Sequence, residues 1–182
     1  MAKRQPTNLI RPATAGAGPF SLGGEEIIQR SDLNDILHGG LTSNLLIGGN
    51  DDDQLIGGDG DDELEGGCGN DYLDGFSGDS DEIDTLTGGE GFDIFVIGDS
   101  LGVDYQSGNS EDTEDFSFAV IKDFSGIDDF IQAAGSADDY DLVFDEFSGN
   151  GIQDTGIYLG DDLIAVLDDT TDVIIDRDFI FV

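Results

Sequence analysis

The chain has 182 residues, of which 42 are Asp or Glu and 6 are Lys or Arg, so its formal net charge at pH 7 is −36. This charge repels phosphate backbones and anionic membranes, which excludes nucleic acid and acidic lipid as partners, and it opposes collapse unless cations lie among the carboxylates. The single cysteine, Cys68, excludes a disulfide framework and a multi-cysteine zinc site. The sequence has no apolar run of about 18 residues, which excludes a membrane-spanning helix.

The N-terminal residues differ in composition from the rest of the chain. Residues 1–22 hold all three prolines and half of the basic residues but no acidic residue, which predicts a flexible leader. Their basic start lacks the apolar segment of a signal peptide. Residues 23–29, with Ile27 and Ile28, are expected to form a short strand or turn that caps the first coil of the following segment.

A nine-residue register organises residues 30–96. Residues 48–74 read GGNDDDQLI, GGDGDDELE and GGCGNDYLD without interruption. The register extends outward to units at 30–38, 39–47, 75–87 and 88–96, of which 75–87 carries a four-residue insertion near 80–83. A period of nine fits neither an amphipathic helix nor a coiled coil, and it indicates an acidic turn followed by a three-residue strand.

Two positions of the unit carry the pattern. The eighth position is always apolar: Leu37, Leu46, Leu55, Leu64, Leu73, Leu86 and Phe95. The sixth position is acidic at Asp35, Asp53, Asp62, Asp71 and Asp93, is Asn44 in the second unit, and is either Asp79 or Asp84 in the expanded unit. We expect the eighth-position side chains to stack into a narrow core whose stability propagates between neighbouring units.

The unit matches G-G-x-G-x-D-x-U-x, the calcium-binding nonapeptide of RTX proteins. Over residues 30–96 the sequence therefore resembles the RTX, or haemolysin-type calcium-binding, family. The resemblance implies an all-β fold, a parallel β-roll that holds several calcium ions. Carboxylate and carbonyl oxygens suit calcium, whereas zinc prefers His and Cys, of which the chain has one each. The alternative is a set of solvated turns without metal, since Gly and Asp favour turns in any case.

In the family fold, successive units alternate between two sides, so the resemblance implies ligands 18 residues apart. On one side these are Asp35 with Asp53, Asp53 with Asp71, and Asp71 with Asp93. On the other they are Asn44 with Asp62, and Asp62 with Asp79 or Asp84; the neutral Asn44 and the insertion predict weaker binding there. The resemblance also implies carbonyl ligands from Gly49, Gly58, Gly60, Gly67, Gly69, Gly89 and Gly91. Asp51 replaces one turn glycine and is tolerable because Asp visits left-handed conformations.

Residues 97–182 are predicted to form a small β-rich cap. Short apolar runs separated by Gly and Asp turns lie at 116–121, 130–131, 142–147, 157–159, 163–167, 173–175 and 179–182, and residues 156–167 suggest a hairpin. The segment AVIKDFSGIDDFIQ resembles the C-terminal portion of cyanobacterial haemolysin-type proteins. The final RDFIFV resembles an uncleaved signal for a type I secretion system, and it equally fits a terminal strand.

The sequence thus predicts a non-enzymatic, secreted protein that folds on meeting extracellular calcium. Gly98 to Gly102 match G-x-S-x-G, so a secreted serine hydrolase using Ser100 is the alternative. It lacks a suitable base, because His38, the only histidine, precedes the serine, whereas hydrolases with this motif place theirs after it. A structural or adhesive cell-surface protein is a third interpretation.

Overall fold

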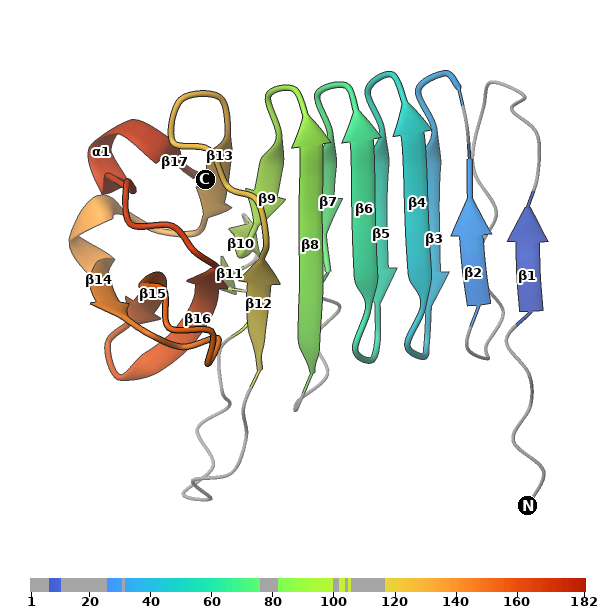
Figure 1. Ribbon diagram of the computed structural model, residues 1–182. Helices are drawn as coiled ribbons and strands as arrows, with labels where there is room; N and C mark the ends of the chain where they lie inside the picture. The colour runs from blue at the N-terminus through green and yellow to red at the C-terminus, as the bar shows by residue number, and fades with distance from the viewer. Residues whose placement is uncertain are drawn as a thin grey trace, which may run out of the picture.

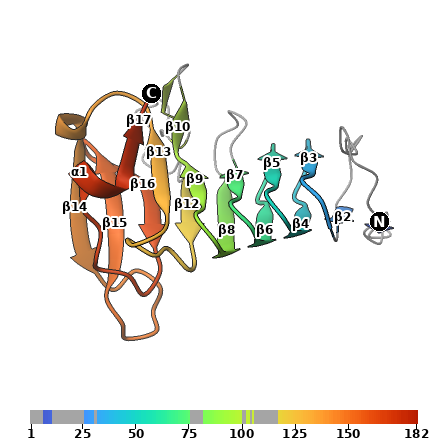
Figure 2. The same cartoon turned by 90° about the horizontal axis from the view of Figure 1, so that it is seen from above.

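The computed structural model describes residues 7–10, 26–30, 32–75, 82–99, 102–103, 105 and 117–182. Two β-sheets dominate it and run side by side along the length of the molecule (Figures 1 and 2). Helical structure in the described residues is limited to a 3₁₀ turn, η1 (Ala137–Asp139), and one short helix, α1 (Ile175–Asp178). The predicted all-β fold, a parallel β-roll followed by further β-structure, is confirmed.

The strands of the roll divide between the two sheets. The nine-stranded sheet has the order β1-β2-β4-β6-β8-β12-β16-β15-β14, formed by Thr7–Ile10, Glu26–Gln29, Leu45–Asn50, Glu63–Cys68, Ile83–Glu90, Phe118–Ile121, Asp162–Leu167, Asp154–Leu159 and Tyr140–Asp145. The six-stranded sheet has the order β17-β13-β9-β7-β5-β3, formed by Phe179–Phe181, Phe130–Ala133, Ile94–Val96, Tyr72–Asp74, Gln54–Gly58 and Ile36–Gly40. A separate pair joins β10 (Gly98–Asp99) to β11 (Gly102–Val103).

Strand pairing in the roll follows the nine-residue repeat. Consecutive units enter opposite sheets, so each strand pairs in parallel with the strand two units away. Leu37 faces Leu55 in the six-stranded sheet, and Leu46 faces Leu64 in the nine-stranded sheet. The insertion lengthens the next step, where Leu64 faces Leu86. The two rows of strands are seen end-on in Figure 2.

The core is a double column of side chains between the sheets. Every predicted eighth-position residue, from Leu37 to Phe95, is fully buried. Alternation along each strand places these side chains inward and their neighbours outward, as the burial pattern of β6 shows. Each coil contributes only one large apolar side chain per strand, so its burial depends on the coils above and below.

The roll begins before the predicted first unit. Ile28 of β2 is fully buried and faces Leu46, so β2 is a coil of the roll and lies in the same column. Residues 7–10, inside the range expected to be a flexible leader, form β1 and pair in parallel with β2. The remainder of residues 1–22 lies outside the described part of the chain.

The roll also continues past residue 96, where the sequence predicted the start of a separate cap. β12 pairs in parallel with β8, and β13 pairs in parallel with β9, so Ile121 faces Leu86 and Ile131 faces Phe95. Both sheets are therefore continuous across this boundary. The predicted hairpin is confirmed as β15 and β16, which pair antiparallel.

One predicted strand, at residues 173–175, is wrong. This segment leads into α1 because the Asp178 carboxylate accepts a hydrogen bond from the backbone N–H of Ile174, 2.8 Å away, which closes a turn. The chain then returns to the six-stranded sheet as β17, parallel to β13. No helix in the described residues is long and apolar enough to cross a membrane.

Candidate metal centre

The acidic turns form two rows, one along each long edge of the roll. The first edge consists of the turns that lead from the nine-stranded to the six-stranded sheet, and the second edge consists of the return turns (Figure 1). The sixth-position residues of the first edge are Asp35, Asp53, Asp71 and Asp93, followed by Asp129. Those of the second edge are Asn44, Asp62 and Asp84.

Hydrogen bonds join the sixth-position residues into a ladder on each edge. One carboxylate oxygen, Oδ1, accepts the backbone N–H of the equivalent residue two units earlier. The N···O distances are 2.7 Å for Asp35 to Asp53, 2.7 Å for Asp53 to Asp71, 2.8 Å for Asp71 to Asp93, 3.1 Å for Asp93 to Asp129, 2.7 Å for Asn44 to Asp62 and 2.8 Å for Asp62 to Asp84. The residues that the sequence pairs two units apart are thus in contact, 18 positions apart in the regular units and 22 across the insertion.

The second carboxylate oxygen has no such partner at most rungs. Oδ2 of Asp53, Asp62, Asp71 and Asp93 is buried and accepts no hydrogen bond, and neither side-chain oxygen of Asp35 does. These carboxylates are between 1% and 3% exposed. Removing a charged oxygen from water without a donor is costly, so this row of oxygens needs a positive charge.

At three regular turns the first glycine of the unit packs tightly against an unpartnered oxygen and a backbone carbonyl; we call this packed position a cradle and name it by its glycine. At Gly48, a β-carbon would lie 2.4 Å from Asp53 Oδ2 and 2.7 Å from the carbonyl oxygen of Gly66. The Gly57 cradle has the same distances to Asp62 Oδ2 and Gly75 O. The carboxylate and carbonyl oxygens thus approach the glycine so closely that no side chain fits there, and both are hard donors of the type that calcium prefers.

The third regular cradle, at Gly66, repeats this arrangement. A β-carbon there would lie 2.3 Å from Asp71 Oδ2 and 2.7 Å from the carbonyl oxygen of Gly88. The first glycine of the unit is therefore required by this close approach. The carbonyls of Gly66, Gly75 and Gly88 were not among the predicted ligands, although the glycine that opens each of these units was a signal for them.

The predicted glycines shape the turns instead. All seven have positive φ: Gly49 (121°), Gly58 (107°), Gly60 (98°), Gly67 (118°), Gly69 (140°), Gly89 (106°) and Gly91 (144°). Asp51, which replaces a turn glycine, has φ of 70°, in the left-handed region that was predicted for it. Their role as carbonyl ligands remains a prediction.

Burial strongly perturbs the ladder carboxylates. Desolvation raises the pKa of Asp53, Asp71, Asp84 and Asp93 to about 6. For Asp62, desolvation and then the negative charge of Asp84 raise the pKa to about 8. These shifts show that the anionic form is disfavoured in the folded protein without a cation.

The second edge departs from the regular pattern at both of its ends. Asn44 places its amide Nδ2, and not a carboxylate oxygen, beside the Gly39 cradle and donates to the carbonyl of Thr42. Asp84 takes the sixth position of the expanded unit, as its bond to Asp62 N shows, whereas Asp79 lies outside the described residues. Asp84 Oδ2 accepts a 2.7 Å hydrogen bond from the hydroxyl of Tyr105.

Two further features of the edges escaped prediction. Asp129 extends the first edge by one rung; its signal was the D-x-U spacing of Asp129 and Ile131. A second, outer row uses the fifth position, where Asp52 Oδ1 accepts the backbone N–H of Asn70 at 2.8 Å and Asp61 Oδ1 that of Ile83 at 2.9 Å. This row links the same turns on their exposed side.

The described residues do not show a nucleophile, base and acid brought together as the serine hydrolase alternative requires. His38 lies in β3, which two strands, β5 and β7, separate from β9 in the six-stranded sheet. Ser100 lies outside the described residues. Cys68 is exposed at the end of β6.

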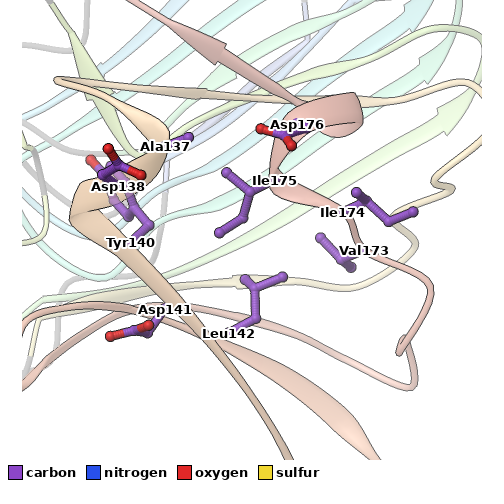
Figure 3. A pocket seen from close by; sticks show the side chains of 9 residues that line it. All are labelled: Ala137, Asp138, Tyr140, Asp141, Leu142, Val173, Ile174, Ile175 and Asp176. Carbon is purple, nitrogen blue, oxygen red and sulfur yellow. The ribbon is translucent and has the colours of Figure 1, made fainter.

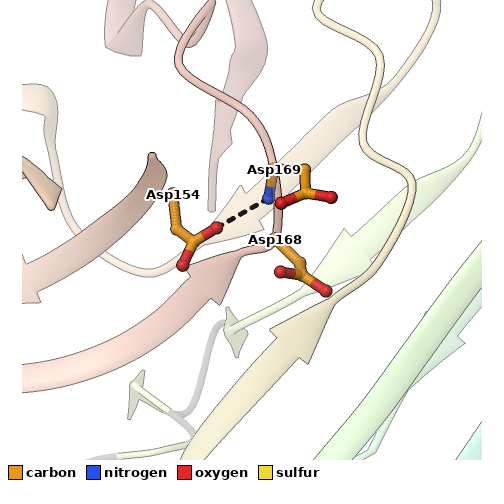
Figure 4. A group of neighbouring side chains, drawn as sticks. All are labelled: Asp154, Asp168 and Asp169. Atoms are coloured by element: carbon orange, nitrogen blue, oxygen red, sulfur yellow. Dashed lines mark hydrogen bonds between the residues drawn. The ribbon is translucent and has the colours of Figure 1, made fainter. Parts of the chain in front are cut away.

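Three more carboxylates gather beyond the roll, at Asp154, Asp168 and Asp169 (Figure 4). Both Asp154 oxygens accept backbone N–H groups, one from Asp169 at 2.8 Å and the other from Phe147 at 2.7 Å and Ser148 at 2.8 Å. Asp168 pairs with Lys122 at 2.6 Å. Protein donors hold both Asp154 oxygens and one oxygen of Asp168, whereas Asp168 Oδ1 is buried without a hydrogen-bond partner.

An open hollow of about 460 Å³ lies between β14 and the segment before α1 (Figure 3). Leu142, Val173 and Ile175 form apolar walls, and Asp138 and Asp176 are acidic groups around it. Its lining of aliphatic, tyrosine and aspartate side chains does not assemble a nucleophile with a base.

Comparison with known proteins shows a similarity to a solved structure. No family model and no curated protein matches the chain. Among solved structures, it is similar to the AlgE6R3 subunit of the Azotobacter vinelandii mannuronan C5-epimerase, with 26% identity over 92% of this chain and 86% of that chain, and a TM-score of 0.46. A TM-score below 0.5 does not establish a shared fold, so the proposals below rest on the geometry of this chain.

Proposed function

We propose that this protein is a calcium-binding β-roll of the RTX type that folds when calcium enters the cradles on its two edges. The observation that carries the proposal is the row of buried, unpartnered Oδ2 atoms of Asp53, Asp62 and Asp71, each facing a glycine carbonyl. Buried carboxylate oxygens without a donor, close to backbone carbonyls, are hard donors that lack a positive partner, and carboxylates supply the charge that calcium favours.

Calcium is coupled to folding because the cradles exist only when the coils stack. Each site combines a carboxylate from one turn with a carbonyl from the turn two units later, such as Asp53 with Gly66. Without cations, buried like charges on neighbouring turns oppose stacking. With free calcium at about 100 times the dissociation constant, each independent site adds about 2.7 kcal/mol to the folded state.

The second part of the proposal is that the protein is exported from the cell, because a chain that folds only with calcium can pass an export channel unfolded. A chain of net charge −36 stays unfolded where calcium is scarce and folds where it is abundant, as in extracellular fluid. A type I secretion system is the proposed route. We propose that the protein acts by binding calcium and not as an enzyme, because its buried carboxylates are those of the ladder and are assigned to calcium.

The test of calcium-coupled folding is circular dichroism of the full chain during a calcium titration from chelator. We expect the β-sheet signal to develop cooperatively with calcium, because several cradles fill as neighbouring coils stack. Magnesium is the control ion: it demands shorter distances and near-octahedral geometry, so it should produce much less folding at equal concentration.

The variant that isolates the cradles is Asp53→Asn combined with Asp71→Asn. Each amide retains an oxygen for the ladder hydrogen bond but not the full anionic charge. This variant should need more calcium to fold than the wild type. A spectrum that is identical in chelator and in calcium would contradict the proposal.

A further inference from the structure

Tyr105 lies at the C-terminal end of the second edge, beside the last sixth-position aspartate. Its side chain is fully buried, and its hydroxyl donates a 2.7 Å hydrogen bond to Asp84 Oδ2. The other oxygen, Asp84 Oδ1, accepts the backbone N–H of Asp62 at 2.8 Å, as at the regular rungs. The two oxygens of this carboxylate therefore both have protein donors.

The hydroxyl stands where a regular cradle has a carbonyl. At Gly57, a β-carbon would meet Asp62 Oδ2 at 2.4 Å and the carbonyl oxygen of Gly75 at 2.7 Å. At Gly75, the next glycine of the same edge, it would meet Asp84 Oδ2 at 2.6 Å and the Tyr105 hydroxyl oxygen at 2.4 Å. A carbonyl and a carboxylate are both acceptors and need a cation between them, whereas a hydroxyl supplies the hydrogen itself.

The first edge ends on a protein donor as well. Asp129, its last rung, has Oδ1 bonded to the N–H of Asp93 at 3.1 Å, and its Oδ2 accepts the N–H of Ser125 at 2.7 Å. Both ladders thus finish with a carboxylate whose outer oxygen accepts a hydrogen bond. The rungs before them, Asp62 and Asp93, have an outer oxygen without a donor.

From this geometry we infer that Tyr105 terminates the calcium series of the second edge: its hydroxyl closes the Gly75 cradle, and Asp84 is held there by a hydrogen bond and not by an ion. The inference rests on the proposed calcium function of the other cradles. It limits the number of ions on this edge, and it gives the Tyr105 side chain a structural role at the end of the roll.

The test compares calcium stoichiometry by isothermal titration calorimetry of the full chain. Asp84→Asn should bind the same number of ions as the wild type, because its amide oxygen can accept the Asp62 N–H while its amide NH2 donates to the Tyr105 hydroxyl oxygen. The matched variant Asp71→Asn, at a regular cradle, should bind at least one ion fewer. Loss of an ion in Asp84→Asn would overturn the inference.

A second measurement is independent of calcium. In chelator, with an osmolyte added to keep the chain folded, Tyr105→Phe removes the donor from a buried carboxylate, so its denaturation midpoint should fall further than that of Tyr140→Phe, whose hydroxyl donates to the neutral carbonyl of Ala134 at 2.9 Å. Equal midpoints for the two variants would count against the inference. If the wild type bound no calcium, the proposed function would fail, while this chelator comparison would still report on the Tyr105 contact.

Discussion

The two edges of the roll are built from the same nine-residue unit, yet they differ in charge. The first edge has an aspartate at every described sixth position, from Asp35 to Asp129. The second edge begins with the neutral Asn44 and ends with Asp84 bonded to Tyr105, which leaves Asp62 as its one regular rung among the described residues. The comparison teaches that the side chain at the sixth position decides whether a turn of the repeat offers a buried carboxylate oxygen without a donor, which is the feature proposed to bind a cation.

Closing a cradle on the first edge should have the largest effect. In Gly66→Ala, the new β-carbon would lie 2.3 Å from Asp71 Oδ2 and 2.7 Å from the carbonyl of Gly88, so the turn must move and the site is lost. We expect the free energy of unfolding in calcium to fall by about 3 kcal/mol or more. Urea denaturation in saturating calcium measures it.

Gly149→Ala is the control for this change. Gly149 has φ of 76° and no atom within 4 Å of the added carbon, so only backbone strain acts, at about 1 kcal/mol. If the two alanine variants lost the same stability, the cradle would not be a special feature of the first edge.

Neutralising one rung of the first edge should have the next largest effect. Asp71→Asn keeps the acceptor for Asp53 N–H but weakens one cation site, which lowers stability in calcium by about 2.7 kcal/mol at 100 times the dissociation constant. In chelator with an osmolyte added to keep the chain folded, the same change removes a buried charge and should not destabilise the protein. Asp161→Asn, at an exposed residue, controls for net charge and should alter neither value much.

Adding a charge to the second edge should make it more like the first. Asn44→Asp places a carboxylate beside the Gly39 cradle, where the carbonyl oxygen of Gly57 already lies 2.4 Å from the position of a β-carbon. We expect stability to rise in calcium and to fall in chelator, each by less than the loss in Asp71→Asn. Gln153→Glu adds the same charge at an exposed position, and a matching response in that variant would refute the site-specific explanation.

A change of pH from 7.5 to 6, in chelator with an osmolyte added to keep the chain folded, should have the smallest effect. The folded-state pKa is about 6 for Asp53, Asp71 and Asp93 and about 8 for Asp62, all above the unfolded value of 3.8, so the folded state binds protons more tightly. This stabilisation is complete below pH 3.8 and is lost as pH rises through 6 on the first edge and through 8 at Asp62. The denaturation midpoint should therefore be higher at pH 6.

Substitution at Asp62 separates its own titration from that of the other ladder carboxylates in that experiment. In Asp62→Asn, the part of the pH dependence between 6 and 8 should flatten, while the part near 6 should remain. A midpoint in chelator that rises with pH over this interval would have the wrong sign for buried, unpaired carboxylates.

The sequence predicts the features that repeat in every unit. It does not predict the places where the repeat is interrupted. The nine-residue spacing predicted the buried column from Leu37 to Phe95 and the contacts between Asp53 and Asp71, because both repeat at every coil. The continuation through Ile121 and Ile131 was not predicted, since long connections break the register there. The Tyr105 contact depends on a single side chain brought in from outside the repeat, which no periodic pattern reports.

A crystal structure of the calcium-saturated protein with an anomalous difference map for calcium tests the central claim most directly. The account predicts ions at about 2.3 to 2.6 Å from Oδ2 of Asp53, Asp62 and Asp71, and none against Asp84 Oδ2. Cradles that remained without ions at saturating calcium, with calcium bound elsewhere on the chain, would contradict it.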